Sequence, residues 1–200
     1  MKELVVILDP AHGFNVAGKC SPDGTHREYR WSRERIRNIK ELLLLRDFEV
    51  LETTMSENEP GLSVRKNFAT NVRPGSRKLL LSLHNNAAGA DCEWHSAQGA
   101  SVYTTPGITD SDRCAKILLD RFEKDFPEVR IRRYNVGELD GDFEERFTVL
   151  MGSGYMACLV EWLFQDNRED LVKLKSAEFN RRFEVSIVEA IEEINNYFKK

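Results

Sequence analysis

The chain has 200 residues, of which 41% are hydrophobic and 31% charged, and its formal net charge is -4. This composition is that of a globular protein and excludes a disordered chain. The acidic balance argues against a nucleic-acid partner, which usually meets a basic face. No stretch approaches the ~20 apolar residues of a membrane span. We therefore predict one domain over residues 1–200, with no nucleic-acid partner and no membrane span.

The N-terminal sequence MKELVVILDP holds one lysine and a short apolar run. It is too short for the core of a secretory signal and lacks a small-residue cleavage site. We expect no signal peptide, and so a protein that stays in the cytoplasm until it is released, or that is exported by another route. The four cysteines lack C-x-x-C spacing and are expected to be free thiols.

Strands and helices alternate along the first half of the chain. Short β-branched or leucine-rich runs predict buried strands, and apolar residues at three- and four-residue spacing predict helices. The expected strands are 4–8, 48–53 and 79–83, and the expected helices are 28–46 and 62–72.

The second half continues the alternation after an irregular segment at 85–98. A strand is expected at 99–104, and Thr109-x-x-Asp112 resembles a capping box that starts a helix ending near Asp125. A strand at 156–164 and helices at 167–174 and from about 179 onward complete the pattern. The alternation predicts an α/β fold: a single domain with a largely parallel twisted sheet and helices on both faces, of phosphorylase/hydrolase-like kind.

The segment 129–147 is the hardest to interpret, because five acidic residues lie between 138 and 145 beside two glycines. A calcium loop and a solvated acidic loop are both open interpretations. The spacing does not match the twelve-residue calcium-loop pattern, which favours the solvated loop.

Two of the four histidines follow predicted strands directly. His12 follows the strand 4–8 and His84 follows the strand 79–83, whereas His26 and His95 lie in irregular segments. In a parallel sheet, ligands gather at the carboxyl ends of the strands. His12 and His84 are therefore expected to meet at one edge of the sheet, where a catalytic zinc would need a third ligand and an open position.

Two glutamates are candidates for the same edge. Glu28 opens the first predicted helix, where it is either a metal ligand or an acid favoured by the helix dipole. Glu161 lies inside an apolar strand, where a carboxylate is costly unless it is paired or close to a cation. Glu161 is either a base that takes a proton from water or one half of a structural ion pair with an arginine.

These motifs together resemble a known family. LDPAHGF around His12, REYRW around Glu28, SLHNNAAG around His84 and LVEWLFQDN around Glu161 occur in the order found in the zinc-dependent N-acetylmuramoyl-L-alanine amidases of the amidase type 3 family. The resemblance runs from Val5 to about Ile194. It implies zinc on His12, Glu28 and His84, with Glu161 as the catalytic residue.

The resemblance also implies a substrate and a reaction. The substrate is peptidoglycan or a muropeptide, cut at the amide between N-acetylmuramic acid and L-alanine. A phage or prophage lysin is one kind of protein that would fit this expectation. Asn85 and Asn86 are expected either to bind substrate or to form a turn. Asp9 is expected either to hold a ligand histidine through its second ring nitrogen or to form a turn before Pro10. The sequence gives no prediction of the oligomeric state.

The sequence departs from the family pattern at three places. Ala11 and Phe14 stand where glycines are usual, and Trp162-Leu163-Phe164 is bulkier than the usual segment after the catalytic glutamate. The bulky segment is expected to alter the shape of the substrate pocket.

Two other functions remain open. A zinc carboxypeptidase or endopeptidase acting on stem peptides would use the same metal chemistry, with Arg30 or Arg65 as a candidate partner for a free substrate carboxylate. A non-catalytic wall-binding module would lack a ligand or the base, yet all four positions are filled.

Overall fold

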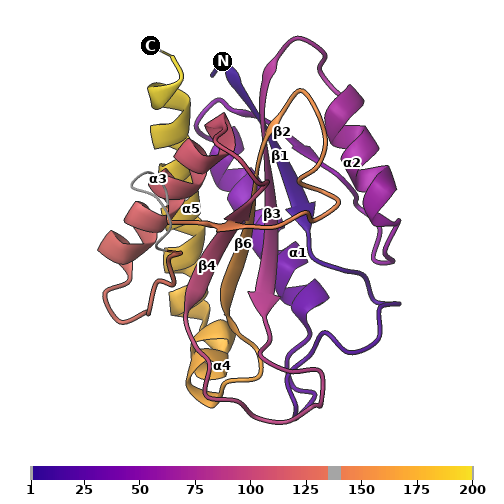
Figure 1. Ribbon diagram of the computed structural model, residues 1–200, viewed down its shortest axis with the longest axis vertical. Helices are drawn as coiled ribbons and strands as arrows, with labels where there is room; N and C mark the ends of the chain where they lie inside the picture. Colours follow the sequence, from indigo (N-terminus) through magenta and orange to yellow (C-terminus); the bar gives the residue numbers. More distant parts are fainter. Residues whose placement is uncertain (1, 135–140, 200) are drawn as a thin grey trace.

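One six-stranded sheet organises the molecule, with its strands in the order β2-β1-β3-β6-β4-β5 (Figure 1). The computed structural model describes residues 2–134 and 141–199. The strands are β1 (Leu4–Pro10), β2 (Glu49–Glu52), β3 (Arg77–Asn86), β4 (Ala100–Thr104), β5 (Phe143–Glu144) and β6 (Met156–Phe164). The helices are α1 (Glu28–Leu44), α2 (Leu62–Asn71), α3 (Asp110–Asp125), α4 (Arg168–Lys175) and α5 (Ala177–Tyr197).

The sheet is mostly parallel. β1 pairs in parallel with β2 and β3, and β3 with β6, whereas β4 runs antiparallel to β6. The chain between β3 and β4 contains no helix, and a parallel return to the same sheet usually needs such a crossover. The predicted single-domain α/β fold with a largely parallel sheet is confirmed.

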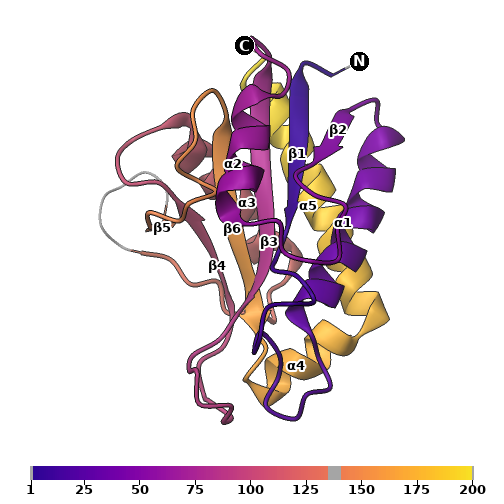
Figure 2. The ribbon, with the colours of Figure 1, turned by 90° about the vertical axis from the view of Figure 1, so that its right-hand side faces the viewer.

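The two faces of the sheet are covered unequally. One face packs against α1, α3 and α5 and buries the larger core, and Figure 2 shows α1 and α5 side by side on it. The other face is covered by α2 and by the chain around Val149 and Leu150, which enclose a smaller cluster. Because this second cover is short, the carboxyl ends of β1, β3 and β6 are left for a site.

The bulky segment after Glu161 belongs to the larger core. Trp162 is fully buried, and its ring stacks on Phe183 with 4.4 Å between centroids. The ladder between β3 and β6 shifts by one residue after His84, and Leu163 adopts a positive φ of 61° there. The expectation that Trp162 shapes the substrate pocket is therefore wrong, because alternation along β6 places Trp162 on the same face as Cys158 and Val160, toward the helices.

Local signals correctly predicted several element ends. Thr109 and Asp112 form the predicted capping box at the start of α3. β3 is longer than predicted and includes His84, because its ladder with β6 continues through that residue.

The acidic segment 138–145 lies partly outside the described residues. In its described part, β5 forms at Phe143 and Glu144, and Asp142 is buried and accepts a hydrogen bond from Thr104. A fully solvated loop is therefore wrong for these residues, and the calcium alternative falls partly on residues 138–140, outside the description.

Two further expectations concern the whole chain. The four cysteines are free, as predicted. Among the described residues, none of the helices combines the length and the apolar character that crossing a membrane requires.

Candidate metal centre

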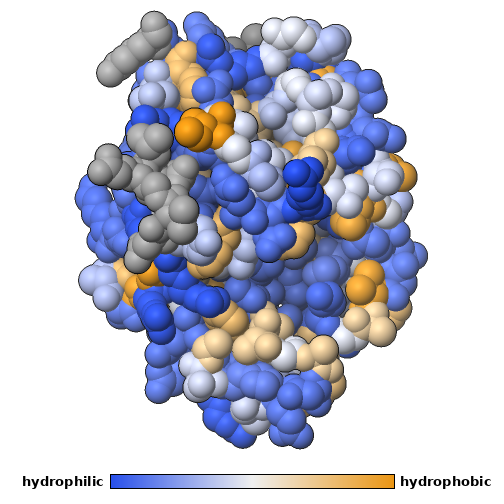
Figure 3. All heavy atoms as spheres, in the orientation of Figure 1, coloured by the Kyte–Doolittle hydropathy of each residue, from blue (hydrophilic) through white to orange (hydrophobic). Residues whose placement is uncertain are grey.

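His84 and Glu161 point to the same face of the sheet. Leu81 and Leu83 belong to the core against α1, α3 and α5, and side chains alternate along a strand. His84 therefore faces the other side, and Glu161 is its register partner on β6. Figure 3 shows that this face of the molecule is hollowed below its centre and that the hollow is mainly hydrophilic.

His12 reaches the same place from a different backbone conformation. It lies two residues beyond β1 and has a φ of 44°, a left-handed conformation that is uncommon for a residue with a side chain. Its Nε2 atom is 3.4 Å from Oε1 of Glu28, and its ring lies edge-on to that of His84 at 5.0 Å between centroids. The left-handed turn thus aims the imidazole back toward the sheet.

Glu28 brings the two histidines together. It is the first residue of α1 and is 1% exposed, and its Oε1 lies 3.0 Å from Nδ1 of His84. Burial by itself would raise the pKa of Glu28, but the hydrogen bonds and charges of His12 and His84 outweigh it and hold that pKa well below its usual range. Glu28 is therefore a carboxylate at neutral pH.

The three side chains form a ligand set that fits a divalent metal ion. One ligand atom from each of His12, Glu28 and His84 lies within 4.8 Å of the others. Two imidazoles and one carboxylate are a known ligand set of catalytic zinc, which keeps a further position open. The donor types and their convergence fit this ion.

Glu161 lies beside this cluster without a partner of its own. Its Oε2 atom is buried and has no hydrogen-bond partner among the described residues. Burial, followed by the negative charge of Glu28, raises the pKa of the Glu161 carboxyl well above its usual range, and Lys19 lowers it to a smaller extent. The open alternative of an ion pair with an arginine is not realised in the described part of the chain.

Asp9 has partners other than the expected histidine. Its fully buried carboxylate accepts hydrogen bonds from Thr53, Ser82 and Arg65, and β1 continues through Pro10. Asp9 therefore does not hold a ligand histidine, because its side chain points toward Arg65 of α2. It also does not form a turn before Pro10, because β1 continues through that residue.

Arg65 is unavailable to a substrate for the same reason. It is 1% exposed and its guanidinium is shared between Asp9, Glu59 and the carbonyl oxygen of Pro10. The peptidase interpretation thereby loses one of its two candidate cations. Arg30 is exposed at the surface, where its Nε donates to the hydroxyl of Tyr29.

The side-chain amide of Asn85 also has hydrogen-bond partners within the protein. Its Nδ2 donates to the carbonyl oxygen of Trp162 at 2.8 Å, and its Oδ1 is 2.8 Å from Nε2 of His26. This buried amide bridges elements of the protein, and both its oxygen and its nitrogen have partners there, which argues against the predicted role of Asn85 in substrate binding. Asn86 is half-buried and its Oδ1 accepts from the backbone N–H of Ala87, so substrate binding by Asn86 stays a prediction.

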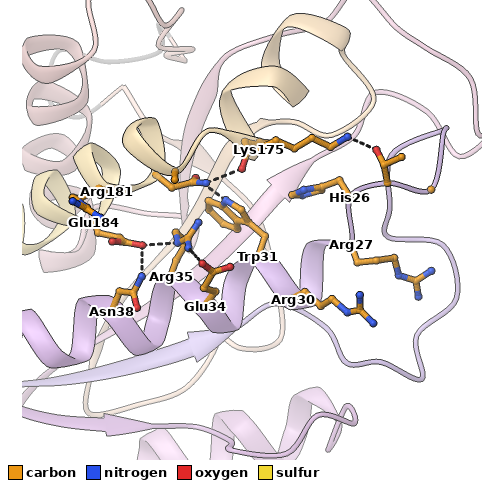
Figure 4. A pocket seen from close by; sticks show the side chains of 15 residues that line it. His26, Arg27, Arg30, Trp31, Glu34, Arg35, Asn38, Lys175, Arg181 and Glu184 are labelled. Carbon is orange, nitrogen blue, oxygen red and sulfur yellow. Dashed lines mark hydrogen bonds and ion pairs between the residues drawn. The ribbon is translucent and has the colours of Figure 1, made fainter.

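His26 lines a pocket that α1 forms with the end of α4 and the first half of α5. Figure 4 shows the pocket, which has a volume of about 410 Å³, with Arg35 placed between Glu34 and Glu184. Burial lowers the pKa of His26, and its ring is held by Asn85. His26 therefore belongs to the framework behind the metal centre rather than to the ligand set.

One residue near the centre was missed by the sequence analysis. Gln165 is 2% exposed, and its Nε2 donates to Oε2 of Glu28 at 3.2 Å, while the backbone N–H of Asn85 donates to Oε1. Such contacts orient a metal-binding carboxylate. The only sequence signal was the position of Gln165 four residues after Glu161, just beyond the strand.

A cluster of two histidines and one glutamate beside a carboxylate, at the carboxyl ends of strands in an α/β sheet, is an arrangement typical of metal-dependent hydrolases. The chain belongs to the N-acetylmuramoyl-L-alanine amidase family, whose family model matches residues 6–193. The resemblance inferred from the four motifs is thereby confirmed. A comparison with curated proteins gave no match.

Solved structures share the fold. An N-acetylmuramoyl-L-alanine amidase from Clostridium difficile 630 superposes with a TM-score of 0.81 at 22% identity, covering 96% of this chain and 97% of that one. The catalytic domain of CwlV from Bacillus (Paenibacillus) polymyxa var. colistinus gives 0.79 at 21%, with the same coverage. The CwlD amidase from Clostridioides difficile, solved with the GerS lipoprotein, gives 0.81 at 16%, covering 98% and 100%.

Proposed function

We propose that the protein is a zinc-dependent N-acetylmuramoyl-L-alanine amidase that hydrolyses the amide between N-acetylmuramic acid and L-alanine in peptidoglycan or muropeptides. The family supports the reaction. The observation that carries the zinc dependence is the convergence of His12, Glu28 and His84 within 4.8 Å, beside the unpartnered Oε2 of Glu161.

In this proposal His12 Nε2, His84 Nδ1 and the Glu28 carboxylate hold the metal. A bound zinc ion supplies a Lewis acid that polarises the amide carbonyl and makes water more acidic. Asn85 and Gln165 fix the Glu28 carboxylate in place through hydrogen bonds.

Glu161 carries the proton in this proposal. Its Oε2 accepts a proton from the attacking water and then delivers it to the leaving nitrogen of L-alanine. Glu161 Oε2 is buried and has no hydrogen-bond partner among the described residues, so this atom is available to accept the proton and to release it again. The expected cellular location stays a prediction that fractionation of the producing cells would test.

The first test is a substitution that removes the proposed general base, the Glu161 carboxylate, and keeps the size and shape of the side chain. We expect Glu161→Gln to reduce kcat by at least ~100-fold, since general bases contribute typically 10²–10⁴-fold, while the zinc content stays that of the parent protein. The matched control is Glu145→Gln, which changes an exposed carboxylate and should leave kcat unchanged. Full activity in Glu161→Gln would refute the role of this residue.

The products distinguish the amidase from the peptidase. Purified peptidoglycan is incubated with the protein and zinc, and the products are identified by mass spectrometry. Free stem peptides that begin with L-alanine, and that disappear when zinc is chelated, are expected. Shortened stem peptides still attached to muramic acid would instead establish the peptidase.

A further inference from the structure

Ser32 is a buried residue of α1 that lies next to the chain segments carrying the three candidate metal ligands. It is fully buried and stands four residues after Glu28 in α1, so the two side chains share one face of the helix. That face is turned toward the ends of β1 and β3, where the ladder between these strands closes with Pro10 opposite Leu83.

The Ser32 hydroxyl joins both strands. Its Oγ accepts a hydrogen bond from the backbone N–H of Ala11 at 2.9 Å and donates one to the carbonyl oxygen of Leu83 at 2.7 Å. Ala11 precedes His12 and Leu83 precedes His84. One buried hydroxyl therefore connects the helix that carries Glu28 to the residue before each histidine.

The chemistry of this position suits only a small group that both donates and accepts. A hydroxyl has one proton and two lone pairs, and here the proton goes to Leu83 while a lone pair receives the N–H of Ala11. An alanine would leave two buried backbone groups without this partner, one beside each histidine. No other residue on α1 contacts the backbone beside both histidines among the hydrogen bonds of the described residues.

We propose that Ser32 is a positioning residue that sets the distance between His12, Glu28 and His84 and thereby the affinity of the centre for zinc. The inference rests on the proposed zinc site. Groups that orient metal ligands without touching the metal typically contribute 10–100-fold to metal affinity. Ser32 acts through the backbone rather than through a ligand side chain, so its loss changes the spacing of all three ligands together.

The test compares zinc affinity in the parent and in Ser32→Ala, by competition with a chromogenic chelator. We expect the affinity to fall at least tenfold. The visible absorption of the cobalt-substituted protein is recorded in parallel, and we expect its band positions or intensities to change, because they report ligand geometry. Ser32→Cys, with a similar size and a weak hydrogen-bonding group, should change in the same direction and serves if the alanine variant does not fold.

Two further variants separate positioning from general stability. Ser186→Ala removes a buried hydroxyl of α5 that has no partner among the described residues, and it should keep the parent's affinity and spectrum. Ser32→Thr keeps the hydroxyl and should restore affinity to within threefold of the parent protein.

The outcomes are distinguishable. Unchanged affinity and an unchanged cobalt spectrum in folded Ser32→Ala or Ser32→Cys would overturn the inference, as would an equal loss in Ser186→Ala. Failure of the proposed zinc site itself would be visible in the parent protein, as an absence of competition with the chelator, and would overturn both proposals at once.

Discussion

The two histidines of the candidate centre are carried by the neighbouring strands β1 and β3 but are held in different ways. His84 remains inside β3, in register with Glu161 on β6. His12 lies beyond the end of β1 with a φ of 44°. The ladder itself fixes His84, whereas no ladder reaches His12.

Contacts from distant elements take the place of the ladder at His12. The Ala11 carbonyl accepts from Arg33, and the Pro10 carbonyl accepts from Arg65, in addition to the bond between Ala11 and Ser32. A left-handed conformation costs roughly 1–2 kcal/mol for a residue with a side chain, and it persists where the surroundings determine it fully. The position of His12 thus depends on contacts from α1 and α2, whereas His84 is held by the sheet in addition to the Ser32 contact at Leu83.

The largest expected loss of stability comes from removing the contacts that Arg65 of α2 makes with the end of β1. Arg65→Met leaves the Asp9 carboxylate buried without its cation and frees the carbonyl of Pro10. Removing one partner of a buried ion pair typically costs 3–5 kcal/mol, and we expect a loss of about that size in the free energy of unfolding, measured by urea denaturation.

The matched control for Arg65 is an exposed pair. Arg182 and Glu128 form an ion pair in which both side chains are over 40% exposed, and such pairs contribute at most about 1 kcal/mol. Arg182→Met also removes an exposed hydrogen bond to the carbonyl oxygen of Asp125 and cation–π contacts with Phe126 and Phe179, and it should still lose clearly less than Arg65→Met. A loss in Arg65→Met no larger than that in Arg182→Met would mean that the end of β1 does not depend on this ion pair.

Short-range patterns in the sequence predicted much of this arrangement. The runs ending in His12 and His84, the apolar strand around Glu161 and the capping box at Thr109 all depend on residues within a few positions of one another. The period of two along a strand then places His84 and Glu161 on one face, and the order of strands brings them together.

The partners of Asp9 and Asn85 were not predictable in this way. Asp9 pairs with Arg65, 56 residues further along the chain, and Asn85 meets His26 at a separation of 59. Strand register and helix packing decide which buried polar side chains form hydrogen bonds with each other. A local sequence pattern contains neither of these. The burial of Trp162 follows instead from the period of two along β6, which places it on the face opposite Glu161.

An intermediate effect is expected from a single hydrogen bond to Asp9. Thr53 Oγ1 donates to Oδ1 of Asp9, and Thr53→Val has nearly the same shape but no donor. Hydrogen bonds to charged groups contribute roughly 1.5–3 kcal/mol, and we expect a loss in this range by urea denaturation. Thr54→Val, which removes only an exposed acceptor, should lose less, and equal losses would show that the buried carboxylate does not need this donor.

The smallest expected change in stability comes from substitutions of the two histidines, which test directly whether their backbones are held differently. Each is replaced by alanine and by glycine, and the four unfolding free energies are measured in the presence of a chelator, so that a metal does not contribute. Both replacements remove the imidazole, and the difference between them reports the backbone alone. At position 12, glycine accepts a positive φ that alanine resists, and we expect the glycine variant to be more stable by about 1 kcal/mol.

At position 84 the sign should reverse. β3 is extended there, and glycine in the interior of a strand is less favourable than alanine by about 0.5–1 kcal/mol, so the alanine variant should be the more stable one. The opposite signs are the prediction, because each variant lacks the same side chain and only the backbone conformation differs between the two sites. If alanine were the more stable variant at position 12 as well, His12 would not be held in a left-handed conformation in solution, and the contacts from Ser32, Arg33 and Arg65 would not determine the geometry of this ligand.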